Sequence, residues 1–201
     1  MINQNKVIRH TGFGLFSHAS ESDFEFMRAV LTNPEYRQHW CHAIRALGFI
    51  GNKQCAEDLL AMLNNKNSKY THEPYVLISA LGFAARKNNC AFNFLVKATE
   101  VCHWEKWVKT ISETQRTESE KWINVYVSKS IQALAYSGRK EVKTFLKHQF
   151  ESMKNPNDPD FDRGALVSAF VNISLIEELG YEKFMHDIYP ISQTKLDEWH
   201  K

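Results

Sequence analysis

Apolar side chains recur along the chain with the spacing of an α-helix. Between residues 36 and 47 they fall at i, i+4, i+7, i+8 and i+11, which places them on one helix face: Tyr36, Trp40, Ala43, Ile44 and Leu47. A second apolar face occupies residues 55–63. Gly48 and Gly51 are expected to break the helix between the two faces. The pattern predicts two short helices joined by a tight turn.

This helix pair returns further along the chain. An offset of 87 residues reproduces both apolar faces, and offsets of 34 and 129 residues reproduce them in part. The phrase Ala-Leu-Gly-Phe-Ile-Gly at 46–51 is echoed at 80–85 and 133–138, and more weakly at 174–180. A recurrence of this length is typical of a stacked helical array, in which each unit buries its apolar face against its neighbours.

The predicted fold class is therefore all-α. We expect an α-solenoid of about four to five stacked helical hairpins within a single domain, 1–201. No segment alternates with the period of a strand. The predicted parts are an N-terminal capping helix at 22–32, repeat units at 33–67, 70–102, 117–154 and 158–189, an insertion at 103–116 and a C-terminal tail at 190–201.

The turn phrase at 46–51 and the leucine-rich helix after it resemble the HEAT-repeat superfamily, in particular the short HEAT-like repeats of phycobilin lyases and many bacterial proteins. The resemblance covers roughly residues 35–188. It implies a right-handed stack of helix pairs whose second helices line a concave surface that commonly binds protein.

The chain departs from this pattern in two places. HEAT-like units usually carry an aspartate just after the turn glycine and an arginine early in the first helix. Here Asn52 and Arg139 occupy the aspartate position, and Trp40 and Cys41 lie where the arginine would be. We therefore expect the stack to be held by packing more than by a polar ladder between units.

Composition narrows the possible partners. The formal net charge of +2 favours neither a general nucleic-acid binder nor an acidic solvating protein. The longest uncharged stretch is thirteen residues, which is too short to span a membrane, and no secretory signal is visible. The four cysteines lack CxxC spacing, so reduced thiols in a cytoplasmic protein are expected. We expect no cofactor, and the oligomeric state is left open.

Charge is unevenly distributed along the chain. Residues 121–154 carry 7 basic and 2 acidic side chains, whereas residues 155–201 carry 4 and 9. Lys140, Lys143 and Lys147 lie on one flank of the helix that follows Gly138. They are interpreted either as a solvated face beside an acidic last repeat or as a basic strip that meets an acidic partner.

Two other groups of side chains are candidates for chemistry. Trp104 and Trp107 have helical spacing, so they belong either to the core or to a surface that stacks on a ligand. His39 and His42 are spaced i, i+3, but a zinc site would need two further ligands. We interpret both histidines as ordinary helix residues and predict no metal site.

The leading functional hypothesis is a non-enzymatic scaffold or adaptor that binds another protein through its second helices. The residues expected to line the binding surface are Glu57, Asn93, Lys97, Lys140, Lys143 and Lys147, with Trp104 and Trp107 as a second candidate region. The alternatives are a HEAT-like enzyme, either a base-excision glycosylase or a chromophore lyase, and a non-catalytic nucleic-acid binder. The concentration of basic residues in one repeat argues against nucleic acid as the partner.

Overall fold

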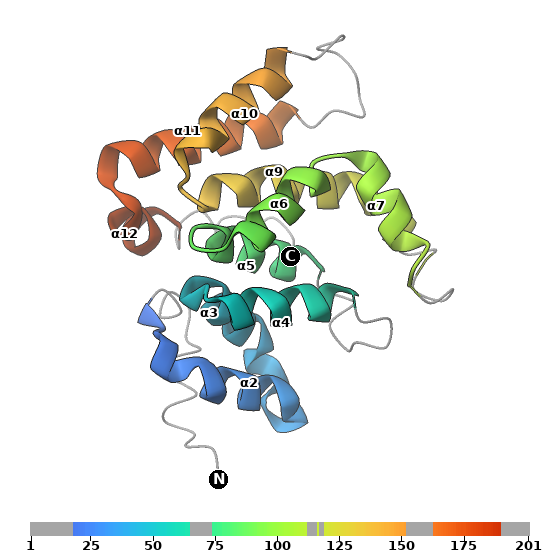
Figure 1. The fold of residues 1–201 in the computed structure, drawn as a ribbon, viewed down its shortest axis with the longest axis vertical. Coiled ribbons are helices and arrows are strands. Elements are labelled where there is room, and N and C mark those ends of the chain that lie inside the picture. Colours follow the sequence, from blue (N-terminus) through green and yellow to red (C-terminus); the bar gives the residue numbers. More distant parts are fainter. Residues whose placement is uncertain (1–17, 65–73, 112–115, 117–118, 152–162, 190–201) are drawn as a thin grey trace.

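The computed structural model describes residues 18–64, 74–111, 116, 119–151 and 163–189. These residues form helices and short connections, with no strand among them, which confirms the all-α prediction (Figure 1). The elements are η2 (Glu21–Asp23), α2 (Phe24–Thr32), η3 (Pro34–His39), α3 (Trp40–Ile50), α4 (Lys53–Asn64), α5 (Pro74–Ala85), α6 (Asn89–Ala98), α7 (Val101–Val108), α9 (Ile123–Tyr136), α10 (Lys140–Glu151), α11 (Arg163–Leu179), α12 (Tyr181–Lys183) and the π-helical turn η4 (Phe184–Ile188).

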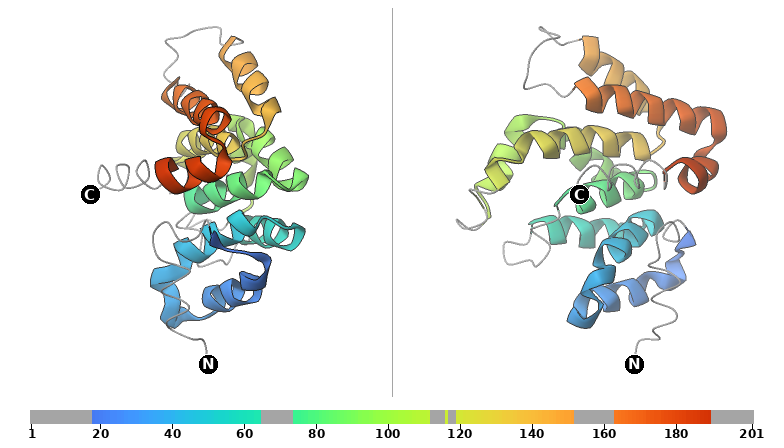
Figure 2. Two further views of the ribbon diagram at one scale, coloured as in Figure 1. Left: turned by 90° about the vertical axis from the view of Figure 1, so that its left-hand side faces the viewer. Right: turned by 180° about the vertical axis from the view of Figure 1, so that it is seen from behind.

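Four helices, α3, α5, α9 and α11, form the centre of the molecule. They pack side by side in this order, and α2 covers the outer side of α3. Helix α4 packs on α3 and α5, α6 packs on α5 and α9, and α10 packs on α9 and α11 (Figures 1 and 2). Ala43, Ile44 and Leu47 of α3 are fully buried, as the apolar pattern predicts. Leu134, the counterpart of Leu47 in α9, is also fully buried.

Two glycines allow the central helices to approach closely. Gly48 lies inside α3, and a Cβ there would overlap the backbone of Ala80, whose carbonyl carbon would lie 2.8 Å away. Gly82 stands in the same relation to Ala133 of α9, at 3.0 Å. The expectation that Gly48 interrupts the helix is wrong, because α3 continues to Ile50. It ends at Gly51, whose φ of 63° is the left-handed conformation typical of a helix C-terminus.

Polar links also join consecutive units. Lys87 Nζ donates to the carbonyl of Ile50 at 3.1 Å, and Arg139 Nε donates to the carbonyl of Ala85 at 2.6 Å. Each cation therefore meets the last turn of the first helix in the preceding unit. A positive charge is favourable there, because the final carbonyls of a helix lack intrahelical partners. These hydrogen bonds accompany the packing on which the stack is mainly expected to depend, and Arg139 provides one of them at the position of the expected aspartate.

The insertion predicted at 103–116 is partly helical. Helix α7 begins at Val101 and ends at Val108, and it packs against α6 and α9. The predicted C-terminal tail at 190–201 lies outside the described residues.

The end of the described chain folds back toward its beginning. Gly180, with a φ of 84°, separates α11 from α12, and Figure 2 shows the chain returning from the end of α11. The Tyr181 ring lies 6.3 Å from that of Phe49 in α3, and Arg86 pairs with Glu182 at 3.1 Å. In an open array each unit contacts only its neighbours. Here the fourth unit also contacts the first two.

Candidate functional site

The polar surface predicted on the second helices is exposed. We call it the second-helix surface and define it by six side chains: Glu57 on α4, Asn93 and Lys97 on α6, and Lys140, Lys143 and Lys147 on α10. The opposite faces of these helices are buried against the central helices, for example through Leu59, Leu95 and Leu146. Each of these helices carries buried apolar residues on one face and polar residues on the other, so its polar side chains point away from the core.

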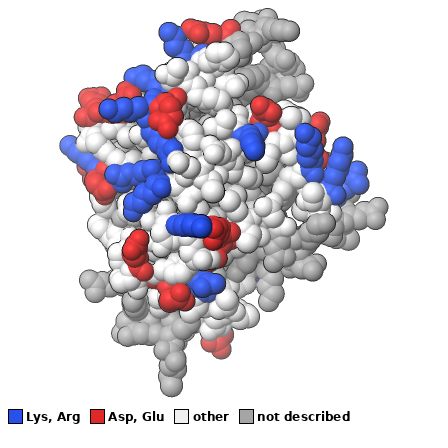
Figure 3. Space-filling model, viewed as in Figure 1, with Lys and Arg blue, Asp and Glu red and all other residues white. Residues whose placement is uncertain are grey.

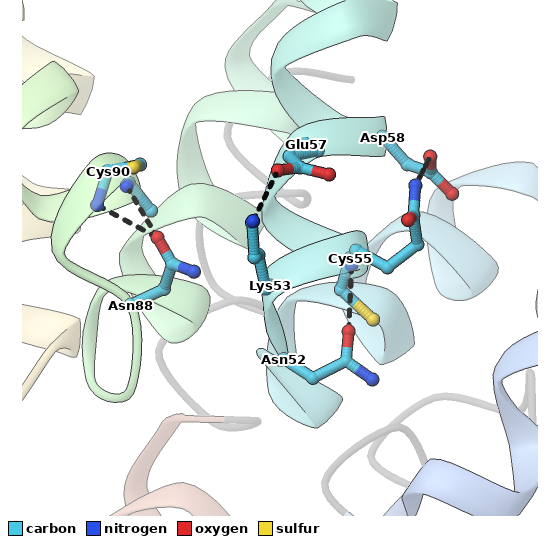
Figure 4. A network of polar contacts seen from close by, with 9 residues as sticks. Asn52, Lys53, Cys55, Glu57, Asp58, Asn88 and Cys90 are labelled. Atoms are coloured by element: carbon cyan, nitrogen blue, oxygen red, sulfur yellow. Dashed lines mark hydrogen bonds and ion pairs between the residues drawn. The ribbon is translucent and has the colours of Figure 1, made fainter.

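Asparagine side chains fix the starts of α4 and α6 in the same way. Asn52 Oδ1 accepts a hydrogen bond from the Cys55 amide at 2.9 Å, and Asn88 Oδ1 accepts one from the Cys90 amide at 2.8 Å (Figure 4). Each bond satisfies an amide that has no intrahelical partner. Asn52, which departs from the aspartate of HEAT-like units, therefore still caps its helix.

Two of the four lysines of the second-helix surface, Lys143 and Lys147, pair with glutamates, and its Glu57 pairs with Lys53. The ion pairs are Lys53–Glu57 at 3.8 Å, Lys143–Glu177 at 2.6 Å and Lys147–Glu151 at 3.7 Å. Figure 3 shows acidic and basic side chains interspersed over this side of the molecule. The Lys143–Glu177 pair links α10 to the acidic last unit, which favours the interpretation as a solvated face. Among the described residues, Lys97 and Lys140 make no ion pair.

Trp104 and Trp107 belong to the core. Trp104 is fully buried and Trp107 is 6% exposed. Their indole N–H groups donate to backbone carbonyls, Trp104 to Ala98 at 2.7 Å and Trp107 to Leu63 at 3.2 Å. The two rings meet edge to face at 5.5 Å. The structure therefore agrees with the core interpretation, and in this conformation neither ring offers a face to a ligand.

The candidate histidines His39 and His42 do not form a pair on one helix face, and His103 lies in a different environment. His39 is the last residue of η3 and His42 lies in α3, so they do not share one regular helix. His103 sits among aromatic rings near Trp104, and burial lowers its pKa, because it disfavours the charged imidazolium. Within the part of the chain that the structure describes, no three His, Cys, Asp or Glu side chains gather as a metal site would require.

Sequence reasoning missed a second face, formed by the central helices on the side away from the second helices. Phe49, Phe83 and Tyr136 hold the same place in three copies of the repeated phrase. The Tyr189 ring packs edge to face on Phe83 at 5.3 Å and on Tyr136 at 5.2 Å. Burial raises the pKa of Tyr136. The aromatic residue that recurs in the phrase was the available signal, but the segment that covers it could not be inferred.

Arg45 lies on this central-helix face too. It is 8% exposed, and its Nε is buried without a hydrogen-bond partner. On α11, by contrast, the same face is open. Val167 and Val171 are 52% and 51% exposed, and Val125 of the adjoining α9 is 37% exposed.

Comparisons with known proteins add no further constraint: no family model matches the chain, and neither curated proteins nor solved structures gave a match. Among the described helices, none has the length and hydrophobicity required to cross a lipid bilayer.

Proposed function

We propose that this protein is a HEAT-like α-solenoid that binds another protein through the second-helix surface, without catalysis of its own. The supporting observation is the serial packing of α3, α5, α9 and α11, with α4, α6 and α10 each packed across two of them. Such an arrangement offers a partner several rigid contact points along one side. This proposal extends the repeat assignment made from the sequence.

The charges that can select a partner are those with no internal counter-ion. Within the second-helix surface, Lys97 on α6 and Lys140 on α10 make no ion pair with any described residue. Lys143 does not, because Glu177 lies 2.6 Å from it. We therefore propose an acidic surface on the partner, attracted mainly by Lys97 and Lys140.

We also propose that the protein works in the cytoplasm. Its four cysteines are all free thiols, and Cys90 and Cys102 are exposed. Exposed thiols are typical of a reducing compartment.

The proposal is tested with two matched double variants. Lys97→Glu with Lys140→Glu changes the second-helix surface, and Lys106→Glu with Lys109→Glu makes the same charge change on and just after α7. Each variant and the wild-type protein are immobilised and exposed to a lysate of the native host. Proteins retained by the wild type are identified and purified, and their affinity is measured by calorimetry at two salt concentrations.

We expect the α7 control to bind like the wild type. The surface variant is expected to bind at least about tenfold more weakly at low salt, because two attractive charges become repulsive. The difference should shrink as salt screens the charges. Equal affinity of the two variants for every retained protein would refute the second-helix surface as the binding site.

A further inference from the structure

Helix α11 carries an exposed stripe along its whole length. The stripe consists of Arg163, Val167, Val171, Ser174 and Glu178, all of which are exposed. At 3.6 residues per turn these positions fall within about 80° of one another around the helix axis. The apolar residues therefore occupy the middle of the stripe, with a cation at its start and an anion at its end.

The two valines are unusually accessible for the centre of a helix. They are 52% and 51% exposed, whereas Leu166, Ala169 and Ile173 on the opposite side of α11 are fully buried. Val125 holds the equivalent place in α9, 42 residues earlier than Val167, and α9 packs against α11. Val125 thus adds an exposed apolar side chain on the neighbouring helix, and exposed apolar surface is typical of an interaction site.

The order of charges along the stripe is self-complementary. If two copies of α11 lie antiparallel about a two-fold axis between residues 170 and 171, Arg163 of each copy faces Glu178 of the other. In the same arrangement Val167 faces Ser174, and the two Val171 side chains meet near the axis. The small Ser174 leaves room for close packing of the helices, and the antiparallel orientation brings opposite ends of the helix dipoles together. A parallel arrangement would place like charges opposite each other.

We propose that the protein forms a two-fold symmetric dimer through this stripe, by antiparallel packing of α11 against α11 of a second copy. A C₂ dimer uses the same patch on both subunits, which is what the charge order fits. Helix α11 has 17 residues, so its length is about 25 Å. One helix pair of this size buries less surface than a standard stable interface, so the dimer is expected to dissociate at micromolar concentrations. This inference goes beyond partner binding and does not depend on it.

The first test is the mass of the full chain in solution. Sedimentation velocity is measured over a concentration series from about 5 to 500 μM, because the dimer is expected to dissociate at micromolar concentrations. The wild-type protein should change from monomer to dimer as its concentration rises. Val167→Glu with Val171→Glu should remain monomeric throughout. Val101→Glu, at another exposed valine (40% exposed, on α7), is the control and should dimerise like the wild type. A wild-type protein that is monomeric at every concentration would overturn the proposal.

Charge reversal tests the two-fold geometry itself. Arg163→Glu alone places glutamate against glutamate in both contacts, and Glu178→Arg alone places arginine against arginine. Each variant should dimerise more weakly than the wild type. An equimolar mixture of the two should regain dimerisation, since both contacts then join opposite charges.

Thermal melting by circular dichroism verifies that the exposed-site variants fold. Should the valine double variant melt early, the charge-reversal mixture still decides the question, because it uses two separately folded proteins. Failure of the mixture to regain dimerisation would refute the antiparallel arrangement. Retention of partner proteins by a monomeric variant would leave the proposed function intact, so the two proposals can fail separately.

Discussion

Adding one methyl group at Gly82 should separate two of the central helices. A Cβ at this position would lie 3.0 Å from the Cα and carbonyl carbon of Ala133, and closer still to its carbonyl oxygen. Ordinary carbon–carbon contacts are about 3.5–4.0 Å. Because the obstacle is backbone and not a flexible side chain, α5 and α9 must move apart.

The expected magnitude combines two opposing effects. Overpacking of a buried contact costs about 3 kcal/mol at the upper end of its usual range. Replacing glycine by alanine inside a helix stabilises it by about 1 kcal/mol. Gly82→Ala should therefore lower the free energy of unfolding by about 2 kcal/mol.

Urea unfolding followed by circular dichroism at 222 nm measures this change. Ala135 provides a matched control, because it holds the place of Gly82 in α9 and is already an alanine. Ala135→Gly should cost about 1 kcal/mol from helix propensity, in addition to the lost methyl contacts. Opposite substitutions at equivalent positions are thus both expected to destabilise. If Gly82→Ala is neutral or stabilising, the close helix contact is not a feature of the folded protein.

Three further predictions concern the core. Leu47→Ala and Leu134→Ala should each lower the free energy of unfolding by about 2–5 kcal/mol, since both leucines are fully buried. If denaturant melts show losses under about 0.5 kcal/mol for both variants, these leucines are not part of the core. Trp107→Phe removes the buried hydrogen bond from the indole N–H to the Leu63 carbonyl, which should cost about 1–3 kcal/mol in the same assay. Burial raises the pKa of Cys55 from 9.0 to about 11, so stability should be retained below pH 9 and fall as the pH rises toward 11. Cys55→Ala should reduce the loss of stability between pH 9 and about pH 11. If the variant and the wild type depend on pH in the same way, the raised pKa of Cys55 is contradicted.

The helices and their buried faces could be predicted because they depend on local spacing. The face of α3 and its counterpart in α9 follow from periodicity alone, as full burial of Leu47 and Leu134 shows. The role of Gly48 could not be predicted in this way. A glycine that ends a helix and one that admits a neighbouring helix look the same in sequence, and only the position of Ala80 distinguishes them.

The sequence also predicts that the second-helix surface is exposed, but it does not predict which of its charges form ion pairs. The outward positions of Lys143 and Lys147 follow from the helical pattern. The partner of Lys143 is Glu177, which is 34 residues away in the chain and comes close only through the packing of α10 on α11. Net charge along a segment does not reveal such pairing.

The return of the chain onto Phe83 and Tyr136 has a consequence for how the protein is made. Synthesis proceeds from the N-terminus, so Phe83 leaves the ribosome about 100 residues before Tyr189, which is a delay of roughly 5–20 s at ordinary elongation rates. During this interval α3, α5 and α9 can already stack, because their contacts are between neighbouring units. The rings of Phe83 and Tyr136, however, lack their contacts with Tyr189 until that residue has been synthesised. The packing of this face is therefore completed only when the end of the described chain has been made, well after the central helices that it covers.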